Sequence, residues 1–352
     1  MKRTIGYILD KTLFLVLVLG VVAVGLGTFL YNNWMLKQRS HFAQHQEILE
    51  TAYQASLQMY RLAIEGFYTN IISQPAYIQV FAEGVAATGE QRGLAKGRLY
   101  RWLYPQYQAM KQHNILQLQF HQADGTSFLR FHKPDRHGDY LLDMRNSVRI
   151  ANTEQRPVSG FETGKVRSGF RYVYPISWQE RHIGSVEVGV TTKGIRDAMA
   201  ALDPQREYAF LVNRKLIEPY VFAEQKWLYS ASTLNPAFLV EDADALLPES
   251  PPPLSATAKE ANRRLFNDPR VQTAMGRGES VTVGTLAAGC PYIVSLLPIF
   301  DVADQLAGYL ITYAPDPVIA TYRREFVVYL TVAVSALGLI GALLLVLRSR
   351  SA

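Results

Sequence analysis

Two long runs without a charged residue, one near each end of the chain, limit what this sequence can fold into. Residues 13–30 form a mostly apolar run of 18 residues, and residues 326–347 form another of 22. A helix rises about 1.5 Å per residue, so the shorter run covers about 27 Å and nearly crosses a hydrocarbon layer of about 30 Å. Both runs therefore predict membrane-spanning helices.

The first run also has the basic start of a secretory signal peptide, at Lys2 and Arg3. A signal peptide ends at a cleavage site made of small residues, whereas this run continues into Tyr31 and Trp34. Aromatic residues of this kind are typical of the membrane interface. We therefore favour a retained anchor over a cleaved signal.

Two spans place both termini on one side of a bilayer and the chain from about 35 to 322 on the other. Basic residues precede the first run and follow the second, which favours a cytoplasmic location for both ends. We predict a two-pass protein of the bacterial inner membrane with a periplasmic ectodomain. Residues 1–34 hold the N-terminus and first span, and residues 319–352 hold the second span and a short tail.

The segment after the second run sets an expectation about signalling. Only five residues follow Leu347 in this sequence, too few to fold into a kinase, a cyclase or a coiled coil. We expect any output to lie in a separate cytoplasmic or membrane signalling partner. We also expect a homodimer. The second run contains small residues that suit close contact between helices, namely Ser335, Gly338, Gly341 and Ala342.

Composition and motifs exclude several classes of protein. Lys and Arg number 36 against 30 Asp and Glu, but much of the excess flanks the apolar runs, so we predict no nucleic-acid partner. The single cysteine, Cys290, excludes an intramolecular disulfide. The sequence has neither an H-E-x-x-H metal spacing nor a G-x-S-x-G nucleophile elbow. We predict no enzyme, no metal site and no cofactor.

The chain between the spans is predicted to be α+β. Residues 35–76 form a long stalk helix and residues 77–112 continue as helix with breaks near glycines. Strand patterns follow at 115–121, 127–133, 170–177 and 182–191, paired as two hairpins, with helices near 142–152 and 193–202. Later strands are predicted at 208–213, 215–222, 280–286, 292–300 and 306–314, with helical or irregular chain at 232–278. We divide the ectodomain into a membrane-distal module, 77–203, and a membrane-proximal module, 204–318.

Alternation along the distal strands separates two faces of the expected sheet. Leu118 and Phe120 point one way and Gln119 and His121 the other, because successive side chains on a strand alternate. The same rule puts Arg130, His132 and Glu187 with the polar set. In the strand at 170–174, parity does not decide between Tyr172 and Tyr174 on one side and Arg171 on the other.

A long connection over residues 133–165 could cover the polar face. Arg130, His132 and Arg145 would then converge beneath it, and guanidinium groups suit a carboxylate, so we expect a small anionic ligand. Two alternatives stay open. The polar face could be bare to solvent, or the arginines could form internal ion pairs with Asp143, Glu162 or Glu187.

Three segments together resemble the double Cache family of extracytoplasmic sensor domains, in the subgroup described as the double sensory domain of two-component sensor kinases. They are LQLQFHQADGTSFLRFHKPDRHGDYLLDMRNSVRIAN, PVSGFETGKVRSGFRYVYPI and HIGSVEVGV. The resemblance covers about 98–192. It implies two PAS-like modules on one long helix, with a small ligand in the distal one. The candidate contacts that it implies are Arg130, His132, Arg145, Tyr172 and Tyr174, with Phe161 and Glu162 at the pocket edge.

Two functions from different classes follow. The first is a membrane-anchored sensor that binds a small ligand in the distal module and signals through its membrane helices. The alternative is an envelope structural or assembly protein whose ectodomain binds another protein and no small molecule.

Overall fold

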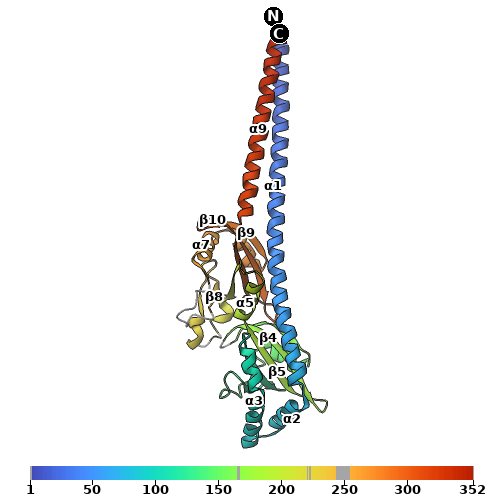
Figure 1. Cartoon of the computed structure of the whole chain (residues 1–352), viewed down its shortest axis with the longest axis vertical. Coiled ribbons are helices and arrows are strands. Elements are labelled where there is room, and N and C mark those ends of the chain that lie inside the picture. The colour runs from blue at the N-terminus through green and yellow to red at the C-terminus, as the bar shows by residue number, and fades with distance from the viewer. Residues whose placement is uncertain (1, 165–166, 220, 222, 243–253, 352) are drawn as a thin grey trace.

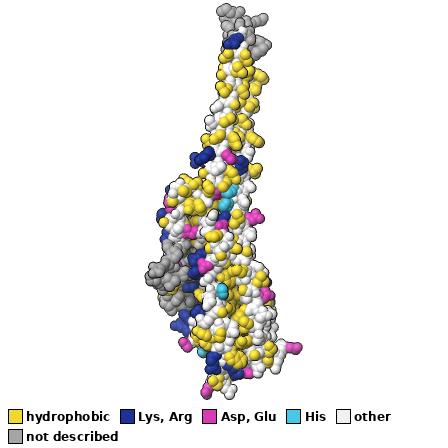
Figure 2. Space-filling view, in the orientation of Figure 1, with side chains coloured by type: hydrophobic (Ala, Val, Ile, Leu, Met, Phe, Trp, Pro, Cys, Tyr) yellow, Lys and Arg dark blue, Asp and Glu magenta, His cyan; other side chains and the backbone are white. Residues whose placement is uncertain are grey.

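Two long helices form a stalk that carries both termini at one end of the molecule (Figure 1). The computed structural model describes residues 2–351 except 165–166, 220, 222 and 243–253. Helix α1 spans Lys2–Phe67 and helix α9 spans Pro317–Ser351. Each contains a segment long and apolar enough to cross a membrane, with none of that segment buried inside the protein. Figure 2 shows hydrophobic side chains covering this part of the stalk.

Helix α1 is continuous from the apolar run into the part of the chain that carries the two sheets. It has 66 residues and is about 100 Å long. The segment contains no proline, and only five glycines interrupt its side-chain pattern. A π-helical turn, η1 at Tyr68–Ile72, ends it. Both sheets lie along its lower half (Figure 1).

Helices α2, at Pro75–Ala86, and α3, at Gly89–Lys111, follow the π-helical turn. The predicted breaks are only partly correct. The chain leaves the helical conformation at Ala87 and Thr88, whereas Gly93 and Gly97 lie inside α3. Helix α3 also accommodates Pro105.

The distal sheet contains the two predicted hairpins. Its strands are β1 (Ile115–Gln122), β2 (Ser127–Arg130), β3 (Val158–Glu162), β4 (Gly169–Trp178) and β5 (Arg181–Thr191), in the order β2-β1-β5-β4-β3 with antiparallel neighbours. Gln179 and Glu180 both have positive φ, as a type I′ hairpin turn requires. Helices α4 (Asn146–Thr153) and α5 (Thr192–Leu202) match predicted helices, whereas β3 was not predicted.

The proximal sheet lies nearer the end of the molecule that carries the two termini (Figure 1). Its strands are β6 (Glu207–Asn213), β7 (Tyr229–Ala231), β8 (Phe238–Glu241), β9 (Val281–Ala287), β10 (Cys290–Phe300) and β11 (Leu306–Pro315), in the order β7-β8-β6-β11-β10-β9. The helical elements beside it are α6 (Arg214–Ile217), η2 (Ala223–Leu228), α7 (Ala256–Leu265) and α8 (Pro269–Arg277).

Two predictions for the proximal unit are wrong. Residues 215–217, the start of the strand predicted at 215–222, are helical, because Asn213 caps the turn by accepting from the Lys215 N–H. Residues 220 and 222 of that predicted strand lie outside the described residues. Strand β8 falls within 232–278, which we expected to be helical or irregular. Its four residues are all buried and pair with β6, so tertiary contact sets their conformation.

The main core lies between α1 and the apolar face of the distal sheet. Leu118 and Phe120 of β1 are buried beside Val186 and Val188 of β5, in the register that pairs Phe120 with Val186. The predicted α+β fold on a long helix, with two terminal apolar helices, is confirmed. The sheet face opposite this core is the polar one.

Candidate functional site

The polar face of the distal sheet forms the floor of a cavity. Register brings Gln119 of β1 opposite both Arg130 of β2 and Glu187 of β5, and Gly189 opposite Arg171 of β4. A side chain larger than hydrogen at Gly189 would collide with the Arg171 guanidinium, because its Cβ would lie 2.5 Å from Nη1. The absence of a side chain at Gly189 therefore leaves room for the Arg171 guanidinium.

The cavity has a volume of about 690 Å³. Residues from the connection after β2 and from the segment between β3 and β4 line it, most of them within 133–165, the segment that we predicted as a lid. Lys165, the last residue of the predicted lid, lies outside the described residues. Three residues of the proximal unit also line the cavity: Leu216, Asp301 and Gln305. The size falls in the range of small-molecule sites, about 300–1,000 Å³.

The lining carries more positive than negative side chains. Six basic residues contribute, against four acidic ones: Arg130, Lys133, Arg136, Arg145, Arg167 and Arg171, with Asp135, Asp139, Asp143 and Asp301. Glu162 and Glu187 are buried behind this wall. Within the described part of the chain, Lys133 and Arg167 make no ion pair.

Arg145 is paired internally. Its Nε donates to Glu162 at 2.6 Å and one Nη donates to both oxygens of Glu187 at 3.0 Å. Burial alone would lower the pKa of Arg145, but the two carboxylates outweigh it and raise that pKa above its ordinary value. Burial likewise opposes ionisation of Glu187, yet Arg145 and Arg171 lower its pKa to about 2. The internal ion pair that we left open is therefore present.

Glu162 is a second anchor for the segment above the cavity. Its carboxylate accepts from the N–H and the hydroxyl of Ser147, at 3.0 and 2.7 Å, in the first turn of α4. A carboxylate at this position also suits the helix dipole. Glu162 thus fixes Arg145 and α4 relative to β3, and it does not itself line the cavity.

Arg171 is the functional candidate that sequence reasoning missed. Its side chain is 3% exposed, its Nη1 lies 3.5 Å from Glu187, and its Nη2 donates to the Arg167 carbonyl at 2.8 Å. Its Nε has no hydrogen-bond partner among the described residues. Burial and the charge of Arg145 lower the pKa of Arg171 to about 10, so it stays a cation at neutral pH. The pairing of β4 with β5 places it on the polar face.

Arg130 and His132 lie at the other side of the cavity. Arg130 makes two contacts to Asp139, Nη1 to Oδ1 at 2.7 Å and Nη2 to Oδ2 at 2.8 Å, and donates to the Arg136 carbonyl. Burial lowers the pKa of His132 to about 4, so its imidazole is neutral at physiological pH. Its Nδ1 is buried without a partner in the described part of the chain.

Three predicted contacts lie on the wrong face of the sheet. The Tyr172 hydroxyl donates to the Leu57 carbonyl of α1 at 3.3 Å, and the Tyr174 ring stacks on Tyr68 at 4.4 Å. Phe161 packs against Phe170 in the same core. The alternation of β4 that exposes Arg171 to the cavity necessarily turns both tyrosines away from it. We therefore remove these three residues from the candidate site.

The fold is a pair of sheet modules on a stalk of two long helices with apolar ends, and comparison with known families identifies its class. The chain belongs to the double Cache family described as the double sensory domain of two-component sensor kinase, whose model matches residues 43–311. A search of curated proteins found no significant match.

Solved structures with a similar fold are distant in sequence. The sensor domain of the histidine kinase DctB from Vibrio cholerae is 13% identical, with a TM-score of 0.45, and the match covers 80% of this chain and 99% of that one. The ligand-binding domain of the chemoreceptor Tlp3 from Campylobacter jejuni, solved with L-valine, is also 13% identical, with a TM-score of 0.42 and coverage of 84% and 97%.

Proposed function

We propose that this protein is a two-pass inner-membrane receptor that binds a small carboxylate-bearing ligand in the distal cavity, with its ectodomain in the periplasm. The observation that carries this proposal is the cavity of about 690 Å³ with six basic residues in its lining. Guanidinium groups held in place by neighbouring carboxylates favour a planar anionic group. The four acidic lining residues would accept hydrogen bonds from hydroxyl or amino groups of the same ligand.

Membrane insertion is supported by the two apolar helices and by both termini lying at one end of the stalk (Figure 1). Lys37 and Glu325 pair at 2.9 Å just beyond the apolar runs, where charged groups meet water at a bilayer surface. The ligand-binding unit then lies at the far end of the molecule from the membrane.

Signal transfer would use the contacts between the distal sheet and α1. The Tyr172 hydroxyl bond to Leu57 joins β4, which carries Arg171 on its other face, directly to that helix. A ligand changes the equilibrium between two conformations of the receptor only as far as it binds one of them more tightly than the other. The partners predicted from the sequence, a second copy and a separate signalling protein, would read the resulting change at α1 and α9.

The test is a thermal-shift screen of the full chain in nanodiscs against a panel of small carboxylates and amino acids. A ligand at one hundred times its dissociation constant should stabilise the protein by about 2.7 kcal/mol. Arg171→Gln should abolish the shift, because it removes the cation proposed to bind the carboxylate. The fold should survive, because Glu187 keeps Arg145 as its partner. Arg156→Gln, at an exposed arginine outside the cavity, is the matched control. If no compound stabilises the wild type while an envelope protein co-purifies with it, the assembly role replaces the receptor role.

A further inference from the structure

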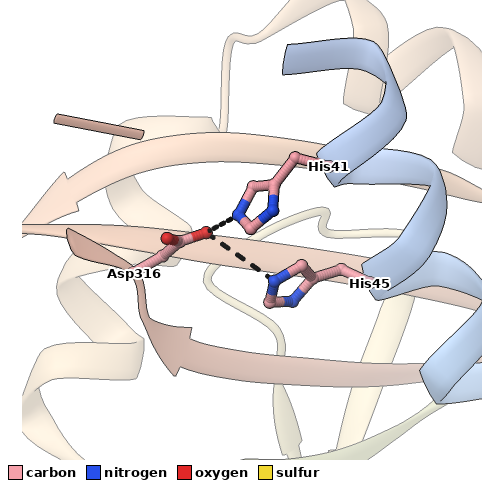
Figure 3. A group of neighbouring side chains, drawn as sticks. All are labelled: His41, His45 and Asp316. Carbon is pink, nitrogen blue, oxygen red and sulfur yellow. Dashed lines mark hydrogen bonds and ion pairs between the residues drawn. The ribbon is translucent and has the colours of Figure 1, made fainter. Parts of the chain in front are cut away.

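Two histidines and an aspartate meet where the stalk joins the ectodomain. His41 and His45 are four residues apart on α1, so both lie on the same face of the helix. Asp316 lies between the end of β11 and the start of α9. Figure 3 shows the three side chains pointing toward one another. The cluster thus joins the two helices that continue into the apolar segments.

The donor atoms are close enough to share one ion. Nε2 of His41 lies 2.6 Å from Oδ2 of Asp316, Nε2 of His45 lies 3.8 Å from the same oxygen, and the three donors all lie within 4.8 Å of one another. Ligands at 2.0–2.2 Å around a tetrahedral zinc are about 3.3 Å apart. Side-chain shifts of about 1 Å therefore convert the hydrogen-bonded cluster into a coordination site.

The surroundings hold the donors in place. The side chains of His41, His45 and Asp316 are 10%, 15% and 3% exposed. The second carboxylate oxygen of Asp316 accepts from the Val318 N–H at 2.9 Å, at the start of α9, which fixes the carboxylate orientation. The His41 ring also packs edge-on against Tyr322, with centroids 5.8 Å apart.

We infer that His41, His45 and Asp316 form a binding site for a divalent transition-metal ion such as zinc, which clamps α1 to α9 at the base of the ectodomain. Two imidazoles and one carboxylate suit zinc or nickel, whereas magnesium and calcium require mainly oxygen ligands. Three protein ligands leave a fourth position for water.

Arg206 opposes metal binding in the arrangement seen here. Its Nη2 donates to Nδ1 of His45 at 3.1 Å, which keeps the proton of that imidazole on Nε2, the atom that would bind the metal. Coordination requires the proton to move to Nδ1 and Arg206 to turn away. Arg206 retains Asp203 as a partner at 2.7 Å when it does so. The site therefore has an internal competitor that lowers its affinity.

Replacing Arg206 should therefore increase the metal affinity of the site, whereas most substitutions near a metal site reduce it. In Arg206→Gln the amide oxygen accepts a hydrogen bond from Nδ1–H of His45, and the repelling charge is gone. Support of this kind around a ligand changes metal affinity by about 10- to 100-fold. We expect Arg206→Gln to bind zinc at least tenfold more tightly than wild type, and a cluster with a purely structural role would not produce this gain.

The experiment measures metal content and affinity of the tag-free full chain in nanodiscs after chelator treatment. After the stripped protein is reloaded with zinc and dialysed, mass spectrometry should find one zinc per chain, and calorimetry should show at least tenfold weaker binding for His41→Gln and His45→Gln. His113→Gln, at an exposed histidine, is the matched control and should bind as wild type does. The melting temperature of wild type should rise with zinc or nickel and stay constant with magnesium.

Wild type that retains no zinc, or zinc that is retained equally by His41→Gln and His45→Gln, would overturn the inference. The melting temperature of wild type needs no variant, so the test stands even if a substitution prevents folding. The site does not involve the distal cavity. A negative result here leaves the proposed ligand binding intact, and the reverse also holds.

Discussion

Arg145 donates from a single guanidinium nitrogen to both carboxylate oxygens of Glu187, at 3.0 Å each, and so ties the segment above the cavity to the middle of β5. The two residues are 42 positions apart, and the Glu187 side chain is 1% exposed. The same carboxylate lies 3.5 Å from Arg171. One buried charge thus sets the position of two of the cationic groups that we propose for ligand recognition.

Glu187→Gln should strongly destabilise the protein, because it leaves Arg145 with one carboxylate instead of two and Arg171 without its nearest one. Breaking a buried ion pair costs about 3–5 kcal/mol. Urea unfolding of the full chain in detergent, followed by tryptophan fluorescence, measures the change. Glu154→Gln, at an exposed glutamate paired with Arg156, should change the free energy of unfolding by less than about 1 kcal/mol. Equal effects of the two substitutions would contradict the assigned role of Glu187.

Glu241 on β8 should make stability depend on pH. Burial raises its pKa from 4.5 to about 7, against the opposing charge of Arg167. Between these values the folded state binds more protons than the unfolded state, so this group's contribution to stability falls as pH rises from about 4.5 to 7. Glu241→Gln should therefore gain stability relative to wild type across this window, on the order of 3 kcal/mol by pH 8. Parallel stability curves for the two proteins would show that Glu241 ionises normally.

Tyr172→Phe and Tyr174→Phe should leave ligand affinity unchanged. Both rings belong to the core between β4 and α1, on the face opposite the cavity, and the phenylalanine rings preserve their packing. Binding to each variant is measured by calorimetry with a ligand identified in the screen. A tenfold loss of affinity in either variant would restore the tyrosines to the site and would contradict the assignment of the two faces.

Cys290 allows a direct test of topology because it is the only cysteine and is exposed. It lies at the start of β10, in the hairpin with β9, within the proposed periplasmic part. In a bacterial host, a membrane-impermeant maleimide should label it in spheroplasts with intact inner membranes. Cys290→Ser gives the background. Labelling that occurs only after lysis would place the ectodomain in the cytoplasm.

The sequence predicted those elements whose signal is local. The apolar runs, the hairpins of the distal sheet and the separation of Leu118 from Gln119 follow from charge, turn residues and alternation. Strand β3 escaped prediction because its segment, Val158–Glu162, does not alternate and gains its conformation from pairing with β4. Strands β7 and β8 are short and depend on β6 in the same way.

The site was predictable only in part because register is a tertiary property. Arg130, His132 and Arg145 line the cavity as expected, while ligand binding by them stays a prediction. Arg171 could not be separated from Tyr172 by sequence, since β4 is buried on both faces. The sequence shows His41 and His45 four residues apart in a helical segment. It does not show their acidic partner, because Asp316 lies 275 residues beyond His41.

The central claim is that the distal cavity is a ligand site, and a structure of the full chain with the ligand from the screen tests it most directly. We predict density for one ligand per chain inside the cavity, with its carboxylate within about 3 Å of the Arg171 guanidinium. Ligand density outside the residues that line this cavity, or an empty cavity at saturating ligand, would contradict the account.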